Sequence, residues 1–201
     1  RRLTLEFDGT ATIVSAITIE PVTVPTIFLI GDSTVCDQSR EPFTSWGQMV
    51  TRFFGPGVAV ANHAESGETY RDSIGRRRLD KIVSVMHRGD WLLMQFGHND
   101  PKTSGHDRMW PDEDTMGDWA NTGSEADTEY KWLLASYAVE VKRRGGIPVI
   151  VSPMTRINMT TGALNPGSLG AYPKAALEAA QLAGVAAIDL HAMSLAVGTA
   201  L

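Results

Sequence analysis

Apolar and polar residues alternate with a period of two over the first part of the chain. The apolar positions are Leu3, Leu5 and Phe7, then Ile13, Ile17 and Ile19. Asp8-Gly9 stands between the two groups and is a strong signal for a two-residue turn, so residues 3–19 are predicted to form a β-hairpin. Because a lone hairpin is marginally stable in water, we expect these strands to belong to a preceding β domain, with residues 21–25 as a linker. The alternative is an extra hairpin that packs on the main domain.

From Thr26 onward, short continuous apolar runs alternate with segments of helical periodicity. The runs predict strands at residues 27–30, 58–61, 90–96, 147–153 and 185–190. The periodic segments predict helices at residues 45–54, 71–87, 130–141 and 174–183. Apolar strands separated by amphipathic helices predict an α/β fold, with a central parallel sheet of about five strands that is covered on both faces.

The composition agrees with a globular domain and narrows the function classes. The chain has 201 residues, of which 43% are hydrophobic and 20% charged, as is usual for one α/β domain. Its net charge of −5 argues against a nucleic-acid partner. Cys36 is the single cysteine, which excludes an internal disulfide, and no apolar run is long enough to span a membrane. The chain begins with Arg1-Arg2, without an initiator methionine or a signal peptide, so we expect it to be part of a longer polypeptide.

Polar clusters follow the first three predicted strands. They are Gly31-Asp32-Ser33, residues 62–69, and Gly97-His98-Asn99-Asp100. Parallel strands bring such clusters to one edge of the sheet, where α/β proteins place their chemistry. The sequence therefore predicts a shared site at the carboxyl ends of these strands.

The residue types in these clusters fit acyl transfer. A serine at a strand-to-helix turn exposes its hydroxyl, and its own N–H can face a developing oxyanion, which makes Ser33 the candidate nucleophile. Gly67 has no Cβ and can bring a second backbone N–H close. Asn99 can add a side-chain donor. Asp32 is expected to hold the first loop through hydrogen bonds to backbone N–H groups.

Three blocks carry a resemblance to a known family. They are "GDSTV", the N-x-A-x-S-G pattern of residues 62–67, and "GHND". In this order they resemble the SGNH, or GDSL-type, hydrolases, and the longer runs "FLIGDSTVCDQ" and "QFGHNDPK" are similar to the branch of rhamnogalacturonan acetylesterases. The resemblance covers roughly residues 26–196.

The resemblance implies a flavodoxin-like three-layer α/β/α fold and a serine esterase that acts on acetyl esters of plant cell-wall polysaccharide. It assigns Ser33 as nucleophile, with the Ser33 backbone, Gly67 and Asn99 as oxyanion hole. It also implies a secreted or periplasmic protein. Since a jelly-roll-like domain often precedes the hydrolase in that branch, residues 1–25 would be its end plus a linker, and residues 26–201 the hydrolase domain.

The general base of the family is absent from the 201 residues. That base is a histidine in an Asp-x-x-His block, and no aspartate here has a histidine three positions later. Asp189 and His191 have the wrong spacing, so His191 is expected at the surface, and His98 is expected to line the site or to be structural. We therefore expect the block after Leu201 and predict that this chain alone is nearly or wholly inactive.

Other interpretations stay open from the sequence alone. A carbohydrate-binding protein without catalysis, or an esterase that acts on xylan or lipid esters, would share these features. Trp110 and Trp119 either stack on sugar rings or pack at the surface. Arg76-Arg77-Arg78 either contacts uronate carboxylates or forms a solvated helix face. No phosphate-binding glycine loop and no histidine–carboxylate cluster with metal-ligand spacing is found, so no cofactor or metal is predicted.

Overall fold

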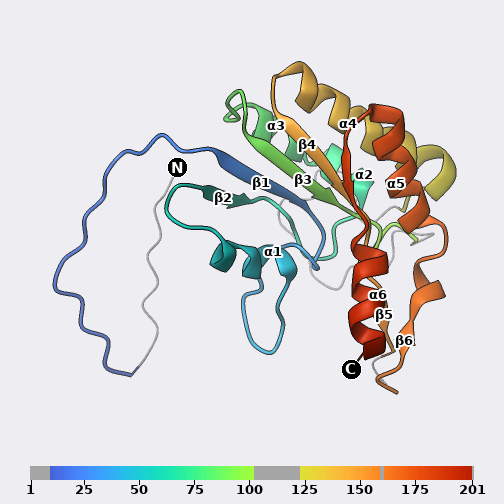
Figure 1. Ribbon diagram of the computed structural model, residues 1–201, viewed down its shortest axis with the longest axis horizontal. Helices are drawn as coiled ribbons and strands as arrows, with labels where there is room; N and C mark the ends of the chain where they lie inside the picture. The colour runs from blue at the N-terminus through green and yellow to red at the C-terminus, as the bar shows by residue number, and fades with distance from the viewer. Residues whose placement is uncertain (1–9, 102–122, 159–160, 201) are drawn as a thin grey trace.

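The computed structural model describes residues 10–101, 123–158 and 161–200. Its centre is a parallel sheet of five strands in the order β2-β1-β3-β4-β7 (Figure 1). The strands are β1 (Thr26–Gly31), β2 (Ala59–Asn62), β3 (Trp91–Gln95), β4 (Ile147–Val151) and β7 (Ala186–Ile188). The predicted α/β fold and all five predicted strands are confirmed.

The strand order creates a crevice at the carboxyl end of β1. This strand pairs with β2 on one side, where Leu29 stands opposite Asn62, and with β3 on the other, where Leu29 stands opposite Leu93. The chain leaves β1 towards β2 and later returns to add β3 on the opposite side. Such a reversal is the topological switch point at which doubly wound sheets bind ligands.

Helices cover both faces of the sheet, as the predicted three-layer fold requires (Figure 1). The elements of one face are α2 (Tyr70–Gly75), α3 (Arg78–Val83), α4 (Lys131–Arg143), which follows the π-helical turn η2 (Ala126–Tyr130), and α5 (Tyr172–Ala183). The other face carries α1 (Trp46–Met49), which continues into the 3-10 turn η1 (Val50–Phe53), and α6 (Leu190–Ala200). The short strands β5 (Arg156–Ile157) and β6 (Leu164–Asn165) and the 3-10 turn η3 (Pro166–Leu169) lie between β4 and α5. No helix among the described residues has the length and apolar character needed to cross a membrane.

The main core lies between the sheet and α2–α5. Alternate strand residues such as Ile30, Met94 and Ile150 are fully buried there, as expected for a parallel sheet under helices. Aromatic rings fill the region below the switch point: Tyr70 packs edge-to-face on Phe96 with 5.0 Å between ring centroids. The loops that follow β1, β2 and β3 therefore stand on a tightly packed base.

The helix predicted at residues 71–87 is divided in the structure. Thr69 and Asp72 form a capping box at the start of α2, and Arg77, with a φ of +54°, separates α2 from α3. This left-handed conformation is uncommon for a residue other than glycine. The break turns α3 relative to α2 and decides where the side chain of Arg78 lies.

The predicted hairpin is not formed in its described half. Residues 12–25 contain neither helix nor strand, and Ile13 is 92% exposed. An alternating sequence becomes a strand only when a partner supplies hydrogen bonds and an apolar surface, and no described strand pairs with this segment. Its first half, residues 1–9, and the predicted sugar-stacking residues Trp110 and Trp119 lie outside the described residues. The preceding β domain stays a prediction.

Candidate active site

The loops after β2, β1 and β3 lie side by side because these strands are neighbours in the sheet. They carry Gly67, Ser33 and Asn99 respectively, and each of these three residues is half-buried. The structure therefore places the three predicted site residues on neighbouring loops at one edge of the sheet.

Hydrogen bonds join each loop to the other two. Glu65 N–H donates to the carbonyl of Gly31 (3.0 Å), which links the second loop to the end of β1. The Asn99 amide donates to the carbonyl of Glu68 (3.0 Å), which links the third loop to the second. The third bridge runs from His98 N–H to a carboxylate oxygen of Asp32 (3.3 Å). These bonds make the three loops one connected unit.

The first loop is held by Asp32, whose side chain is fully buried. One of its oxygens accepts hydrogen bonds from the N–H of Thr34 (3.0 Å) and from the Thr34 hydroxyl (2.8 Å). The predicted positioning role of Asp32 is thereby confirmed. Gln38 donates to the carbonyl of Ser33 (2.7 Å). The N–H of Ser33 has no hydrogen-bond partner within the described residues, so this donor is available to a ligand.

A close approach explains the glycine before Asp32. A Cβ on Gly31 would lie 2.1 Å from the carbonyl oxygen of Gln95 on β3, so no side chain fits there. Gln95 is itself fully buried; it donates to the Thr34 hydroxyl and accepts from the Trp46 indole N–H (2.7 Å). This role of Gln95 could not be predicted from the sequence, because an amide at the end of an apolar strand can equally face solvent.

The second loop presents Gly67 in a tight turn. Glu68 N–H donates to the carbonyl of Glu65 (3.4 Å), and Gly67, the third residue of the turn, has a φ of +78°. This is the conformation that a type II turn requires at its third position, where glycine is favoured. In the described part of the chain no group accepts a hydrogen bond from the Gly67 N–H, and a Cβ at Gly67 would meet nothing within 4 Å.

The third loop is held by Asp100, which is 1% exposed. One of its oxygens accepts from the N–H of Gly97 (2.9 Å), and the other accepts from the N–H of Tyr70 and the hydroxyl of Ser124, both at 2.9 Å. Burial raises the pKa of Asp100 to about 7, although these donors favour the ionised form. The hydrogen bond from the Asn99 amide to Glu68 uses one of its two N–H groups, which leaves the other for a ligand.

The two histidines near the site have structural partners. His98 Nε2 lies 2.9 Å from the carbonyl of Met154, and burial lowers the pKa of this histidine, which favours a neutral ring that donates through Nε2. His191 Nδ1 lies 3.2 Å from the carbonyl of Pro153, and the residue is half-buried instead of exposed as predicted. Neither ring is hydrogen-bonded to Ser33 in the described structure.

Cys36 lies close to Ser33 along the chain but does not suit nucleophilic chemistry. Burial and the nearby carboxylates raise the pKa of its thiol to about 11. The thiol is therefore protonated near neutral pH, whereas a reactive cysteine needs a thiolate. Cys36 is also buried, whereas Ser33 is half-buried and therefore more accessible.

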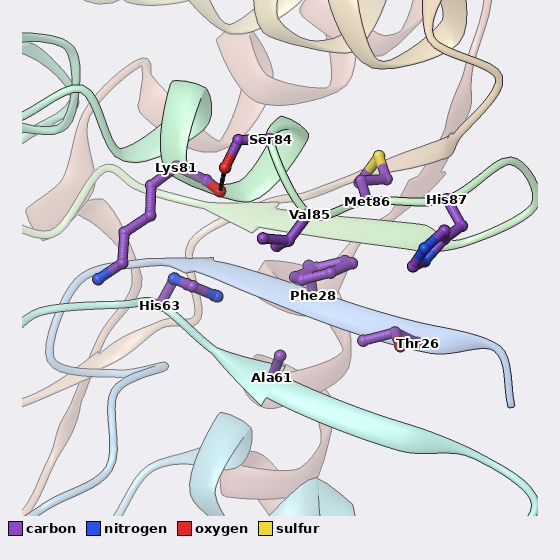
Figure 2. Close-up of a pocket in the computed structure, with 9 residues that line it drawn as sticks. All are labelled: Thr26, Phe28, Ala61, His63, Lys81, Ser84, Val85, Met86 and His87. Atoms are coloured by element: carbon purple, nitrogen blue, oxygen red, sulfur yellow. Dashed lines mark hydrogen bonds between the residues drawn. The ribbon is translucent and has the colours of Figure 1, made fainter. Parts of the chain in front are cut away.

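A separate cleft of about 730 Å³ lies between β1, β2 and α3 (Figure 2). Its lining includes Phe28, His63, Lys81 and Met86 and contains none of the three predicted site residues. Burial lowers the pKa of His63, and the cations of Lys81 and Arg78 lower it further. The cleft thus lies next to the second loop, which contains His63, and is separate from the predicted site.

The sequence profile of the GDSL-like lipase/acylhydrolase family matches residues 29–200, which include all three loops. The chain belongs to this family. The suspected resemblance to GDSL-type hydrolases is therefore confirmed, and so is the fold that it implied.

Relatives of the chain include esterases of known name. Rhamnogalacturonan acetylesterase RhgT of Bacillus subtilis is 32% identical over 168 residues, which are 83% of this chain and 65% of that protein. The probable rhamnogalacturonan acetylesterase YesY of the same species is 29% identical over 176 residues, or 85% of this chain and 72% of its own length. The chain thus spans about two thirds of the length of these relatives.

Solved structures of the family have the same fold. The crystal structure of YxiM from Bacillus subtilis matches with a TM-score of 0.68 and 25% identity, over 90% of this chain and 47% of that one. An acetylxylan esterase from Geobacillus stearothermophilus, solved as a catalytic mutant, matches with a TM-score of 0.63 and 21% identity, over 88% and 81% of the two chains.

Proposed function

We propose that the protein is a serine esterase that removes O-acetyl groups from polysaccharide, with rhamnogalacturonan as the preferred substrate class. The observation that carries this proposal is the set of unpaired donors on the three loops that carry Ser33, Gly67 and Asn99. Ser33 and Gly67 keep free backbone N–H groups within the described structure, and Asn99 keeps one amide N–H, on three loops that are hydrogen-bonded to one another. The names of the Bacillus subtilis relatives support the substrate class.

In the proposed reaction the Ser33 hydroxyl oxygen attacks the acetyl carbonyl carbon and forms a tetrahedral oxyanion. The N–H groups of Ser33 and Gly67 and the Asn99 amide stabilise its charge. Collapse breaks the ester C–O bond, the sugar hydroxyl leaves with a proton, and water then hydrolyses the acetyl-serine. The base that accepts the serine proton is the histidine of the predicted Asp-x-x-His block, which the 201 residues do not contain.

A second candidate is carbohydrate binding without catalysis. It is favoured for the 201-residue chain by itself, because neither described histidine near the site contacts Ser33. Both candidates predict glycan binding, but only the esterase predicts acetate release.

The test compares the 201-residue chain with the polypeptide read to the end of its gene. Release of acetate from acetylated rhamnogalacturonan and from p-nitrophenyl acetate is measured for both. We expect hydrolysis by the longer polypeptide, its loss in Ser33→Ala, and no change in Ser39→Ala, a matched control at an exposed serine of the same loop. Glycan binding without acetate release by either polypeptide would support the second candidate. The same proposal expects a secreted or periplasmic enzyme, which fractionation of the source cells would test.

A further inference from the structure

The turn that presents Gly67 is held by a partly buried ion-pair cluster that the sequence did not predict, in which the Glu65 side chain is 46% exposed. Arg78, at the start of α3, donates from Nη2 to Glu65 (2.8 Å) and from Nε to Glu68 (3.0 Å). Its side chain is 17% exposed and that of Glu68 is fully buried. Arg78 thus fits neither sequence-based interpretation of the arginine triplet, since it is not solvated and its carboxylate partners belong to this chain.

The two glutamates are the first and last residues of the Gly67 turn. A type II turn and the related type I turn differ by a flip of their central peptide, which here contains the Gly67 N–H. A guanidinium that holds both ends of the turn therefore restricts the direction in which this N–H points. The backbone carbonyl of Glu68 also accepts the hydrogen bond from the Asn99 amide. The contacts of Arg78 with Glu65 and Glu68, here called the clamp, therefore support the third loop as well.

We propose that Arg78 is a positioning residue for the oxyanion hole, which it maintains by clamping Glu65 and Glu68 on either side of Gly67. The inference rests on the proposed esterase function for its effect on rate, but the geometry of the turn can be tested without activity. Burial of a charged cluster is costly unless every partner is well placed, so this position tolerates little change.

The cluster also makes the turn sensitive to pH. Burial raises the pKa of Glu68 to about 7; Arg78 and Arg76 oppose this shift, and Glu65 adds to it. Tyr137, on α4, faces the same carboxyl and has its own pKa raised, mainly by burial. The second oxygen of Glu68 is buried without a hydrogen-bond partner in the described structure, which agrees with a carboxyl that binds a proton readily. Below about pH 7 the Glu68 carboxyl therefore binds a proton, and Arg78 loses the negative charge of this partner.

The direct test measures the Gly67 amide by nuclear magnetic resonance in wild type, Arg78→Met and Arg77→Met. Arg77 is the matched control, since it is adjacent but 79% exposed and pairs only with Asp80 among the described residues. We expect a backbone order parameter of about 0.85 for Gly67 in wild type and the control, and a fall towards about 0.6 in Arg78→Met. In wild type the Gly67 amide shift should titrate with a midpoint near pH 7, and this titration should vanish in Glu68→Gln.

The kinetic test uses the polypeptide that hydrolyses p-nitrophenyl acetate. Arg78→Met should lower kcat about tenfold or more with KM within about twofold, because the lost interaction acts in the transition state. Should Arg78→Met not fold, Arg78→Lys and Glu65→Gln each loosen one side of the clamp and should give smaller losses in the same direction. An unchanged Gly67 order parameter together with an unchanged kcat would overturn the inference. If wild type hydrolyses no ester, the proposed function fails, and the order parameters still decide the role of Arg78.

Discussion

Buried carboxylates brace both ends of the sheet, but only the carboxyl end carries the three predicted site residues. At the amino end Asp90 accepts hydrogen bonds from the N–H groups of Thr26 (2.8 Å) and His87 (2.7 Å). At the carboxyl end Asp32 and Asp100 do the same for backbone groups of their own loops. A buried carboxylate is therefore a general device for fixing loops in this protein and no sign of chemistry.

The difference lies in the residues that the two ends present. At the amino end Asp90 binds two backbone N–H groups and lies 3.6 Å from the His87 ring, and none of the three predicted site residues is there. The carboxyl end carries Ser33, Gly67 and Asn99, and the N–H groups of Ser33 and Gly67 have no hydrogen-bond partner within the described structure. Both N–H groups belong to half-buried residues on adjoining loops, and the proposed function uses them as donors to a developing negative charge.

The largest effect is expected from Asn99→Ala, which removes a donor found only at the carboxyl end. Loss of one oxyanion donor lowers kcat by about 10²–10³. The measurement is kcat for p-nitrophenyl acetate, with Asn165→Ala, an exposed asparagine on β6, as control. Activity of Asn99→Ala within threefold of the control would remove Asn99 from the site.

Asp100→Asn and Asp90→Asn compare the two ends directly. Each replaces a buried acceptor that holds two or more donors, so each should lower the free energy of unfolding by about 1–3 kcal/mol in urea titrations. Only Asp100→Asn should also lower kcat, by about tenfold, because the position of Asn99 depends on it. Equal losses of kcat in both variants would show that the two ends do not differ in function.

Gly67→Ala and Gly162→Ala form a second matched pair. Both glycines have positive φ, +78° and +71°, and open space where a Cβ would stand. Each variant should therefore lose about 1–2 kcal/mol of stability from backbone strain alone. Only Gly67→Ala is expected to lower kcat as well, and a similar kcat loss in Gly162→Ala would point to a global effect of strain.

The last prediction concerns stability alone, through its pH dependence. The pKa of Asp100 is raised from its usual 3.8 to about 7 by burial, so the folded state holds a proton that the unfolded state releases. The stability of wild type relative to Asp100→Asn should therefore fall as pH rises from about 4 to 7, by no more than about 1.4 kcal/mol per pH unit. A difference between the two proteins that is constant over this range would mean that the carboxyl has an ordinary pKa.

The sequence predicted those parts of the fold that follow from local pattern. Continuous apolar runs identified all five strands of the sheet, and strand ends gave the positions of Ser33, Gly67 and Asn99. The division between α2 and α3 could not be predicted, because the left-handed conformation of Arg77 carries no local signal in an arginine triplet. The described half of the predicted hairpin shows the opposite case: its local pattern is clear, but a strand also needs a partner.

The burial of charged side chains was the second feature that could not be predicted from the sequence. No sequence pattern distinguishes Arg78, Glu68 and Asp100 from exposed charged residues. Whether each side chain is buried depends on how α3 and the loops pack. The polar cluster at residues 62–69 already contained Glu65 and Glu68, but their three-residue spacing became meaningful only when the turn between them and its clamp were seen. The candidate catalytic residues were thus easier to predict than the residues that hold their loops in place.

The most direct test is a crystal structure of the catalytically competent polypeptide after reaction with a serine-directed phosphonate. The account predicts a covalent bond from phosphorus to the Ser33 oxygen, with one phosphoryl oxygen about 2.7–3.1 Å from the nitrogens of Ser33, Gly67 and the Asn99 amide. Modification of another residue, or a phosphoryl oxygen that contacts neither Gly67 nor Asn99, would contradict it.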